Sequence, residues 1–283
     1  MVRSGIALAA AALLPACQPS APGAPAVELY AMDCGRIAFT DTTLFADDGS
    51  FDGVARDFVN PCYLIRHPEG DLIWDLGFPD ALADMPDGLR VEAFNATITK
   101  PVTLAAQLQQ LGLSAADIEF VSVSHSHSDH VGNAAMFAET AAWIVDADER
   151  AHMFRDEARQ SDEFAAYAPL EQARTILIEG DGRHNVFGDG SVTIIQAPGH
   201  TPGHTIVLVR TANSGTVLLT GDMFHMAESR ERRTVPIFNT DRAATLASMD
   251  LVETIADEES ARVVRQHVPE DMQALPAFPE ALN

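Results

Sequence analysis

The chain has 283 residues, 47% of them hydrophobic, which suits one large globular domain or two small ones. Lys and Arg number 18 against 41 Asp and Glu, so the formal net charge is −23. This acidity argues against nucleic acid, anionic lipid headgroups and polyanionic substrates as partners, because the field of the protein repels phosphate.

The N-terminal residues read as a targeting segment. Arg3 precedes an apolar run, Gly5 to Leu14, that is too short to span a bilayer. The run ends in the letters LPAC and resembles a bacterial lipobox. Residues 1–16 are therefore expected to be a lipoprotein-type signal peptide, with Cys17 as the lipid anchor of an exported protein of the periplasm or cell envelope. A plain secretory signal cut near the same place is the alternative.

Residues 17–26 are rich in Pro, Ala, Gly and Ser and are expected to be a tether, followed by a folded domain over residues 27–283. Two further cysteines, Cys34 and Cys62, lie in apolar, strand-like contexts. In an exported protein these two cysteines could form a disulfide. We expect buried free thiols instead, because free cysteine is among the most buried residue types.

The first half of the domain is rich in predicted strands. They cover residues 27–39, 61–67 and 71–77, and the last two are joined by the turn Pro68-Glu69-Gly70. The polar stretch from Asp41 to Asn60 is long for a connection, so it is expected to be a functional loop over a pocket or at the contact of a homodimer. A helix is predicted from Pro101 to Leu111 and a buried strand from Phe120 to Val123.

In the second half, strands are predicted at 141–145, 175–178, 192–195, 205–209, 216–219 and 262–264, and helices at 146–158 and 241–256. This mixture of strands and interspersed helices indicates a layered α/β or α+β sandwich.

The segment SHSHSDH, residues 124–130, carries the chemistry. It places His125, His127, Asp129 and His130 directly after a buried strand. Because side chains alternate along an extended chain, His125 and His127 lie on one side of it. Asp129 and His130 lie further round the turn, so the segment can face two metal ions. Imidazole and carboxylate without thiolate suit zinc, although manganese or iron also fits these ligand types.

Three later residues have the same character. His200 lies in the turn-rich segment APGHTPGH, while Asp222 and His267 follow the apolar runs VLLTG and ARVVRQ. Ligands delivered from strand ends are held rigidly, as metal chemistry requires.

The order HSHSDH, PGHTPGH, GD after a strand and a late His resembles the metallo-β-lactamase superfamily. The resemblance implies an α+β fold, the αββα sandwich, with a dinuclear metal site at one edge of the two sheets. One Zn2+ would take His125, His127 and His200, and the other Asp129, His130 and His267. Asp222 would bridge both ions together with a hydroxide.

A finer resemblance, in LYAMDCGRI, PCYLIRHPEGDLIWDLG and QHVPED, is to the N-acyl homoserine lactonases, which are quorum-quenching enzymes. Where the best-known members of that family have a tyrosine three residues after the bridging aspartate, this chain has His225. The surrounding GDMFHMAESR and PIFNTD are similar to methyl parathion hydrolase and its relatives.

The resemblance implies that the bridging hydroxide attacks an ester-type carbonyl of a small lactone, while Asp129 protonates the departing alkoxide and His225 holds the carbonyl or acts as a second acid. The alternatives are an organophosphate or aryl-ester hydrolase, a β-lactamase, and a non-catalytic zinc-binding protein of the envelope.

Other residues have plainer interpretations. His204 is expected to support a ligand rather than to bind metal, and Asp75 either orients a metal-binding histidine or caps a turn. His67, His152 and His184 are expected at the surface. Met223, Phe224 and Met226 either line an acyl-chain channel or pack in the core.

Overall fold

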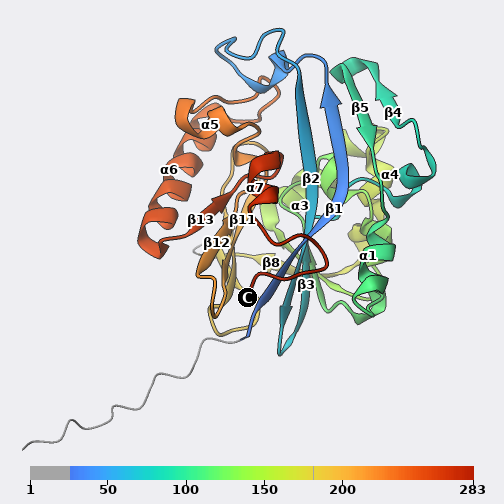
Figure 1. The fold of residues 1–283 in the computed structure, drawn as a ribbon, viewed down its shortest axis with the longest axis vertical. Helices are drawn as coiled ribbons and strands as arrows, with labels where there is room; N and C mark the ends of the chain where they lie inside the picture. Colours follow the sequence, from blue (N-terminus) through green and yellow to red (C-terminus); the bar gives the residue numbers. More distant parts are fainter. Residues whose placement is uncertain (1–25, 181) are drawn as a thin grey trace, which may run out of the picture.

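The computed structural model describes residues 26–180 and 182–283, so the predicted signal peptide and nearly all of the predicted tether lie outside the described residues. Two β-sheets stack face to face, and helices cover both outer faces (Figure 1). The predicted αββα sandwich is confirmed. Among the helices of the described residues, none combines the length and the apolar character that a membrane span requires.

The first sheet has the strand order β4-β5-β1-β2-β3-β6-β7-β8. Strands β1 to β5 pair antiparallel where they adjoin, whereas β3, β6, β7 and β8 run parallel. Its strands are β1 (Glu28–Phe39), β2 (Arg56–His67), β3 (Gly70–Trp74), β4 (Leu89–Val91), β5 (Ala96–Thr99), β6 (Phe120–Ser122), β7 (Ala142–Asp146) and β8 (Arg174–Ile178).

The second sheet has the order β13-β12-β11-β10-β9. Its strands are β9 (Arg183–Asn185), β10 (Val192–Gln196), β11 (Thr205–Arg210), β12 (Thr216–Leu219) and β13 (Arg262–Val264). The helices are α1 (Leu104–Gln110), α2 (Ser128–Val131), α3 (Ala147–Met153), α4 (Phe164–Tyr167), α5 (Ala227–Arg232), α6 (Arg242–Glu259) and α7 (Pro269–Gln273).

The central strands are apolar on both faces because each face packs against a different layer. In β11, Val207 and Val209 enter the core between the two sheets, while Ile206 and Leu208 pack against α6. Since side chains alternate along a strand, one continuous apolar run serves two cores. Further packing layers lie between the first sheet and helices α1 and α3, and around a group of phenylalanines at one end of β1 and β2.

Two sequence-based expectations are wrong here. Cys34 and Cys62 form a disulfide, with an S–S distance of 2.01 Å, rather than free thiols. The predicted loop Asp41 to Asn60 is shorter than expected, because β2 begins at Arg56 and pairs with the end of β1. The polar composition of Arg56 to Asn60 hid this pairing, since the outer end of β2 has exposed residues.

The three histidines expected at the surface are not fully exposed. The His67 side chain is only 3% exposed, because its ring stacks on Phe187 at 4.2 Å and contacts the Asp189 carboxylate at 2.9 Å. His152 and His184 are half-buried, and burial lowers the pKa of both rings, that of His152 to about 4.

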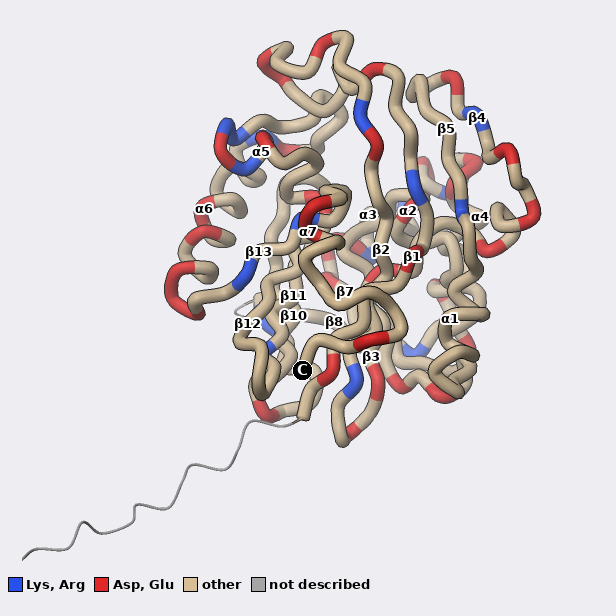
Figure 2. Tube along the Cα trace, viewed as in Figure 1, with Lys and Arg blue, Asp and Glu red and all other residues tan. Residues whose placement is uncertain are grey.

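Surface charge is distributed rather than gathered. Acidic residues occur on most outer segments, including α6, and basic residues are few (Figure 2).

Candidate metal centre

The seven predicted ligands come from four loops at one edge of the sandwich. The loop after β6 carries His125 and His127 and runs into the short helix α2, which carries Asp129 and His130. The others come from the connections after β10, β12 and β13. Because neighbouring strands end at the same edge of the sheets, ligands far apart in the sequence become adjacent in space. All seven are brought together, as predicted: His125, His127, Asp129, His130, His200, Asp222 and His267.

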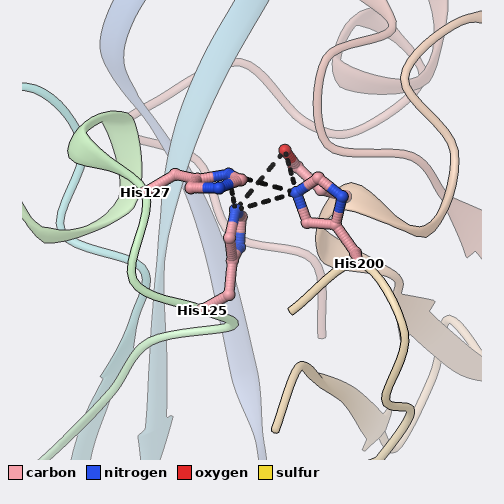
Figure 3. Close-up of side chains that lie close together, drawn as sticks. His125, His127 and His200 are labelled. Carbon is pink, nitrogen blue, oxygen red and sulfur yellow. Dashed lines mark hydrogen bonds and ion pairs between the residues drawn. The ribbon is translucent and has the colours of Figure 1, made fainter. Parts of the chain in front are cut away.

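Three imidazole nitrogens form the first half of the cluster. His125 Nε2 lies 2.8 Å from His127 Nδ1, and His200 Nε2 lies 3.2 and 3.1 Å from these two atoms. Figure 3 shows the three rings converging on one point. Burial lowers the pKa of all three rings, which leaves them neutral with lone pairs available.

The second half consists of Asp129, His130 and His267. Nε2 of His130 lies 3.5 Å from the Asp129 carboxylate, and Nε2 of His267 lies 3.6 Å from it. Burial lowers the pKa of His130, but the neighbouring carboxylates of Asp129 and Asp75 outweigh burial and raise it well above the usual value.

Asp222 reaches both halves. Its Oδ2 lies 3.7 Å from His125 Nε2 and 3.6 Å from His200 Nε2, while its Oδ1 lies 3.3 Å from His130 Nε2 and 3.0 Å from His267 Nε2. One carboxylate oxygen thus faces each set of imidazoles, which is the arrangement of a bridging ligand.

The hydrogen bonding of two buried atoms indicates whether the cluster suits metal ions. Within the described residues, Asp222 Oδ1 and His130 Nε2 have no hydrogen-bond partner. Leaving buried polar atoms unsatisfied is costly, and a cation between them would satisfy both. Nitrogen and oxygen donors without thiolate are ligands for a divalent metal of the zinc type. The residues therefore fit divalent metal ions.

Neighbouring groups fix the histidine tautomers. His130 Nδ1 donates to Asp75 Oδ2 at 2.9 Å and His267 Nδ1 donates to the Val59 carbonyl at 2.9 Å. In both rings the proton on Nδ1 leaves the Nε2 lone pair directed into the cluster. Asp75 therefore orients a candidate ligand, which decides between its two sequence-based interpretations.

His204 supports Asp222, as expected. Its Nδ1 donates to the Ala197 carbonyl at 3.1 Å, so its Nε2 accepts the backbone N–H of Asp222 at 3.1 Å. The ring holds the backbone of the bridging carboxylate and offers no lone pair to the cluster.

His225 lies beside the candidate metal centre. Its Nε2 is 3.1 Å from Asp222 Oδ2, and its ring packs 5.1 Å from Phe45 and 5.9 Å from Phe238. The structure thus places His225 where a substrate would meet the cluster, but its predicted chemical role stays a prediction.

An apolar pocket of about 530 Å³ opens next to the cluster, and Asp129, Asp222, His225 and His267 form part of its wall. Six phenylalanines and several aliphatic side chains form most of the rest of the lining, and the phenylalanines are Phe39, Phe45, Phe58, Phe78, Phe94 and Phe238. Phe45 belongs to the loop predicted between Asp41 and Asn60. That loop therefore lies over the pocket, which is one of the two positions expected from the sequence.

Sequence analysis missed most of this wall. Its only available signal was the number of phenylalanines, 14 against 3 tyrosines and 2 tryptophans. Of the three residues considered for an acyl-chain channel, Met223 and Phe224 pack in the core beside α6, whereas Met226 joins the phenylalanine group near the pocket.

Comparison with known proteins agrees with this site. The family model described as the metallo-beta-lactamase superfamily matches residues 55–267, so the chain belongs to that superfamily. It is a metal-dependent hydrolase of this class.

Several curated proteins similar to this chain are lactonases by name. The chain is 28% identical over 266 residues to N-acyl homoserine lactonase AttM of Azorhizobium caulinodans, covering 90% of this chain and 97% of the relative. It is 29% identical to an N-acyl homoserine lactonase of a Bacillus species, covering 89% of this chain and 98% of the relative. These relatives confirm the resemblance to the lactonase branch.

Among solved structures, one is an N-acyl homoserine lactone hydrolase with the product N-hexanoyl-L-homoserine bound at its catalytic metal center. It is 26% identical, with a TM-score of 0.75, and the match covers 90% of this chain and 98% of that one. The dizinc quorum-quenching lactonase AidC, at 18% identity and a TM-score of 0.64, shares the fold.

Proposed function

We propose that this protein is a dinuclear zinc hydrolase that opens the lactone ring of N-acyl homoserine lactones. The observation that carries the proposal is the position of Asp222, whose two carboxylate oxygens face two separate sets of imidazoles beside an apolar pocket. The lactonase relatives support this choice of substrate.

The shape of the site supports an amphipathic substrate. A lactone ring is small and polar and suits the cluster, while an acyl chain suits the phenylalanine-lined pocket beside it. The acidic surface disfavours anionic substrates, and a lactone is uncharged.

A pair of bound zinc ions supplies a water that ionises near neutral pH and Lewis acidity towards a carbonyl. The chain's own residues orient the substrate and exclude bulk water from it. The walls at Phe45 and Phe238 keep bulk water from the carbonyl, and His225 reaches it from the side of Asp222. The Asp129 carboxylate, which lines the pocket, would take a proton from the attacking water and pass it to the ring oxygen when the ring opens.

The test is a substrate panel on metal-loaded protein. An N-acyl homoserine lactone, a penicillin, an aryl ester and an aryl phosphotriester are compared at equal concentration. We expect the lactone to give the highest kcat/KM, and chelation to abolish its turnover. No turnover of the lactone by protein that holds its metal would refute the proposal.

Hydrolysis of aryl esters or organophosphates is the second candidate. The observation that favours it is His225, which stands where the best-known lactonases have a tyrosine and packs directly against the pocket phenylalanines. The same panel separates the two functions, since a phosphotriester turned over faster than the lactone would favour the second.

We also propose that the protein is exported and lipid-anchored at Cys17. The disulfide between Cys34 and Cys62 supports export, because disulfides persist in oxidising compartments and are rare in the cytosol. Labelling with a fatty-acid analogue tests the anchor. Label is expected in the membrane fraction of wild type and absent from Cys17→Ala, and unlabelled wild type would contradict the proposal.

A further inference from the structure

We propose that Glu149 is a positioning residue for one half of the metal cluster, and that it selectively sets the affinity of the site formed by His125, His127 and His200. The inference rests on the proposed two-ion function. Glu149 is only 1% exposed and lies in the first turn of α3, which carries none of the seven ligands.

The Glu149 carboxylate joins two loops that are far apart in the sequence. Its Oε1 accepts the backbone N–H of Ser126 at 2.8 Å, and Ser126 lies between His125 and His127. Its Oε2 accepts the Thr201 hydroxyl at 2.6 Å and the Gly203 N–H at 3.0 Å, directly after His200. One side chain therefore fixes the distance between the loops that supply all three imidazoles.

The second loop packs closely on α3. A Cβ at Gly203 would lie 2.2 Å from the Glu149 backbone nitrogen, so only glycine allows this approach. The helix itself is held by Asp146, whose carboxylate caps the backbone N–H groups of Asp148 and Glu149. A capped helix is a rigid mount, so the position of Glu149 is transmitted to both loops.

The other half of the cluster has a different support. Asp75 accepts the Ser124 N–H on Oδ1 at 2.6 Å and His130 Nδ1 on Oδ2 at 2.9 Å. Among the described hydrogen bonds, none joins Glu149 to Asp129, His130 or His267. Asp75 also reaches His125, because it binds the Ser124 hydroxyl at 3.0 Å and that hydroxyl lies 3.0 Å from His125 Nδ1. Asp75 thus serves both halves, whereas Glu149 binds only the loops of the first half, so a change at Glu149 should weaken that site selectively.

Glu149→Gln is the sharpest perturbation because it keeps the size of the side chain. An amide has one acceptor oxygen and an NH2 group, whereas the native carboxylate receives donors on both oxygens. In either orientation the NH2 group faces an N–H or O–H donor, and one of the two loops loses its acceptor. Loss of such a supporting partner typically lowers metal affinity 10- to 100-fold.

The experiment is a Zn2+ titration of chelator-stripped protein, with the ions located by anomalous diffraction from crystals. For wild type we expect two ions. For Glu149→Gln we expect one affinity to fall about 10- to 100-fold while the other is unchanged, and the remaining ion to lie on Asp129, His130 and His267. Thr103→Ala, which removes the cap of the distant helix α1, is the control for general destabilisation and should bind as wild type does.

A second variant covers the case in which Glu149→Gln does not fold. Thr201→Val removes one donor and keeps the carboxylate, and it should weaken the same site by a smaller factor. Equal weakening of both sites, or no change at either, overturns the role of Glu149. Fewer than two ions in wild type overturns the proposed two-ion function instead.

Discussion

Removing the disulfide between Cys34 and Cys62 should cost the protein a measurable part of its stability. The bond joins neighbouring strands β1 and β2 and spans a sequence separation of 28 residues. For a loop of that length the chain-entropy model gives about 3.6 kcal/mol at 25 °C. In a chain of this size that corresponds to a fall in Tm of roughly 7–10 °C.

The assay is urea unfolding with and without a thiol reductant, for wild type and for the double variant Cys34→Ala, Cys62→Ala. Both sulfurs are fully buried, so the reductant acts on the unfolded chain and shifts the equilibrium away from the native state. We expect the reductant to destabilise wild type and to leave the variant unchanged. A wild-type midpoint that does not respond to the reductant would refute the reasoning.

Three further predictions concern the site and the pH dependence of stability. Phe94→Ala should raise KM about tenfold for a decanoyl lactone and little for a butanoyl one, because Phe94 lines the pocket from the segment between β4 and β5, where only the longer chain is expected to reach. Leu177→Ala on β8 is the control, and equal effects on both substrates would contradict the pocket assignment. His225→Phe should keep the metal content and lower lactone kcat at least tenfold; unchanged kcat would exclude a role for this ring. The pKa of His152 is lowered to about 4 by burial and by Arg155. The contribution of the neutral ring to the free energy of unfolding is therefore complete above pH 6.5 and is lost as the pH falls towards 4. Because the ring is half-exposed, we expect only about 1 kcal/mol, and His152→Asn should flatten the pH dependence of unfolding over that range.

The sequence predicted those parts of the fold that depend on local pattern. The apolar runs Thr216–Leu219 and Arg262–Val264 are strands with the predicted bounds, and Asp222 and His267 follow them into the cluster. A buried strand and the polar residue after it are adjacent in sequence, so both are visible in one short window.

Features that depend on distant contacts were not predictable in this way. The short outer strands β4 and β5 lack a long apolar run, and their pairing depends on β1. The Cys34–Cys62 bond requires the β1–β2 register, and Glu149 acquires its role only because α3 packs against loops 23 and 52 residues away. The pocket phenylalanines come from several elements and follow no common period.

The central claim is that Asp222 joins two metal ions in one site, and metal counting tests it most directly. Inductively coupled plasma mass spectrometry of purified protein should find two zinc ions per chain, and crystals should show two anomalous peaks roughly 3.5–4 Å apart, one on each side of Asp222. Asp222→Ala should hold fewer than two ions. A wild-type protein that is active with one ion or none, or an Asp222→Ala variant that keeps both, would contradict the account.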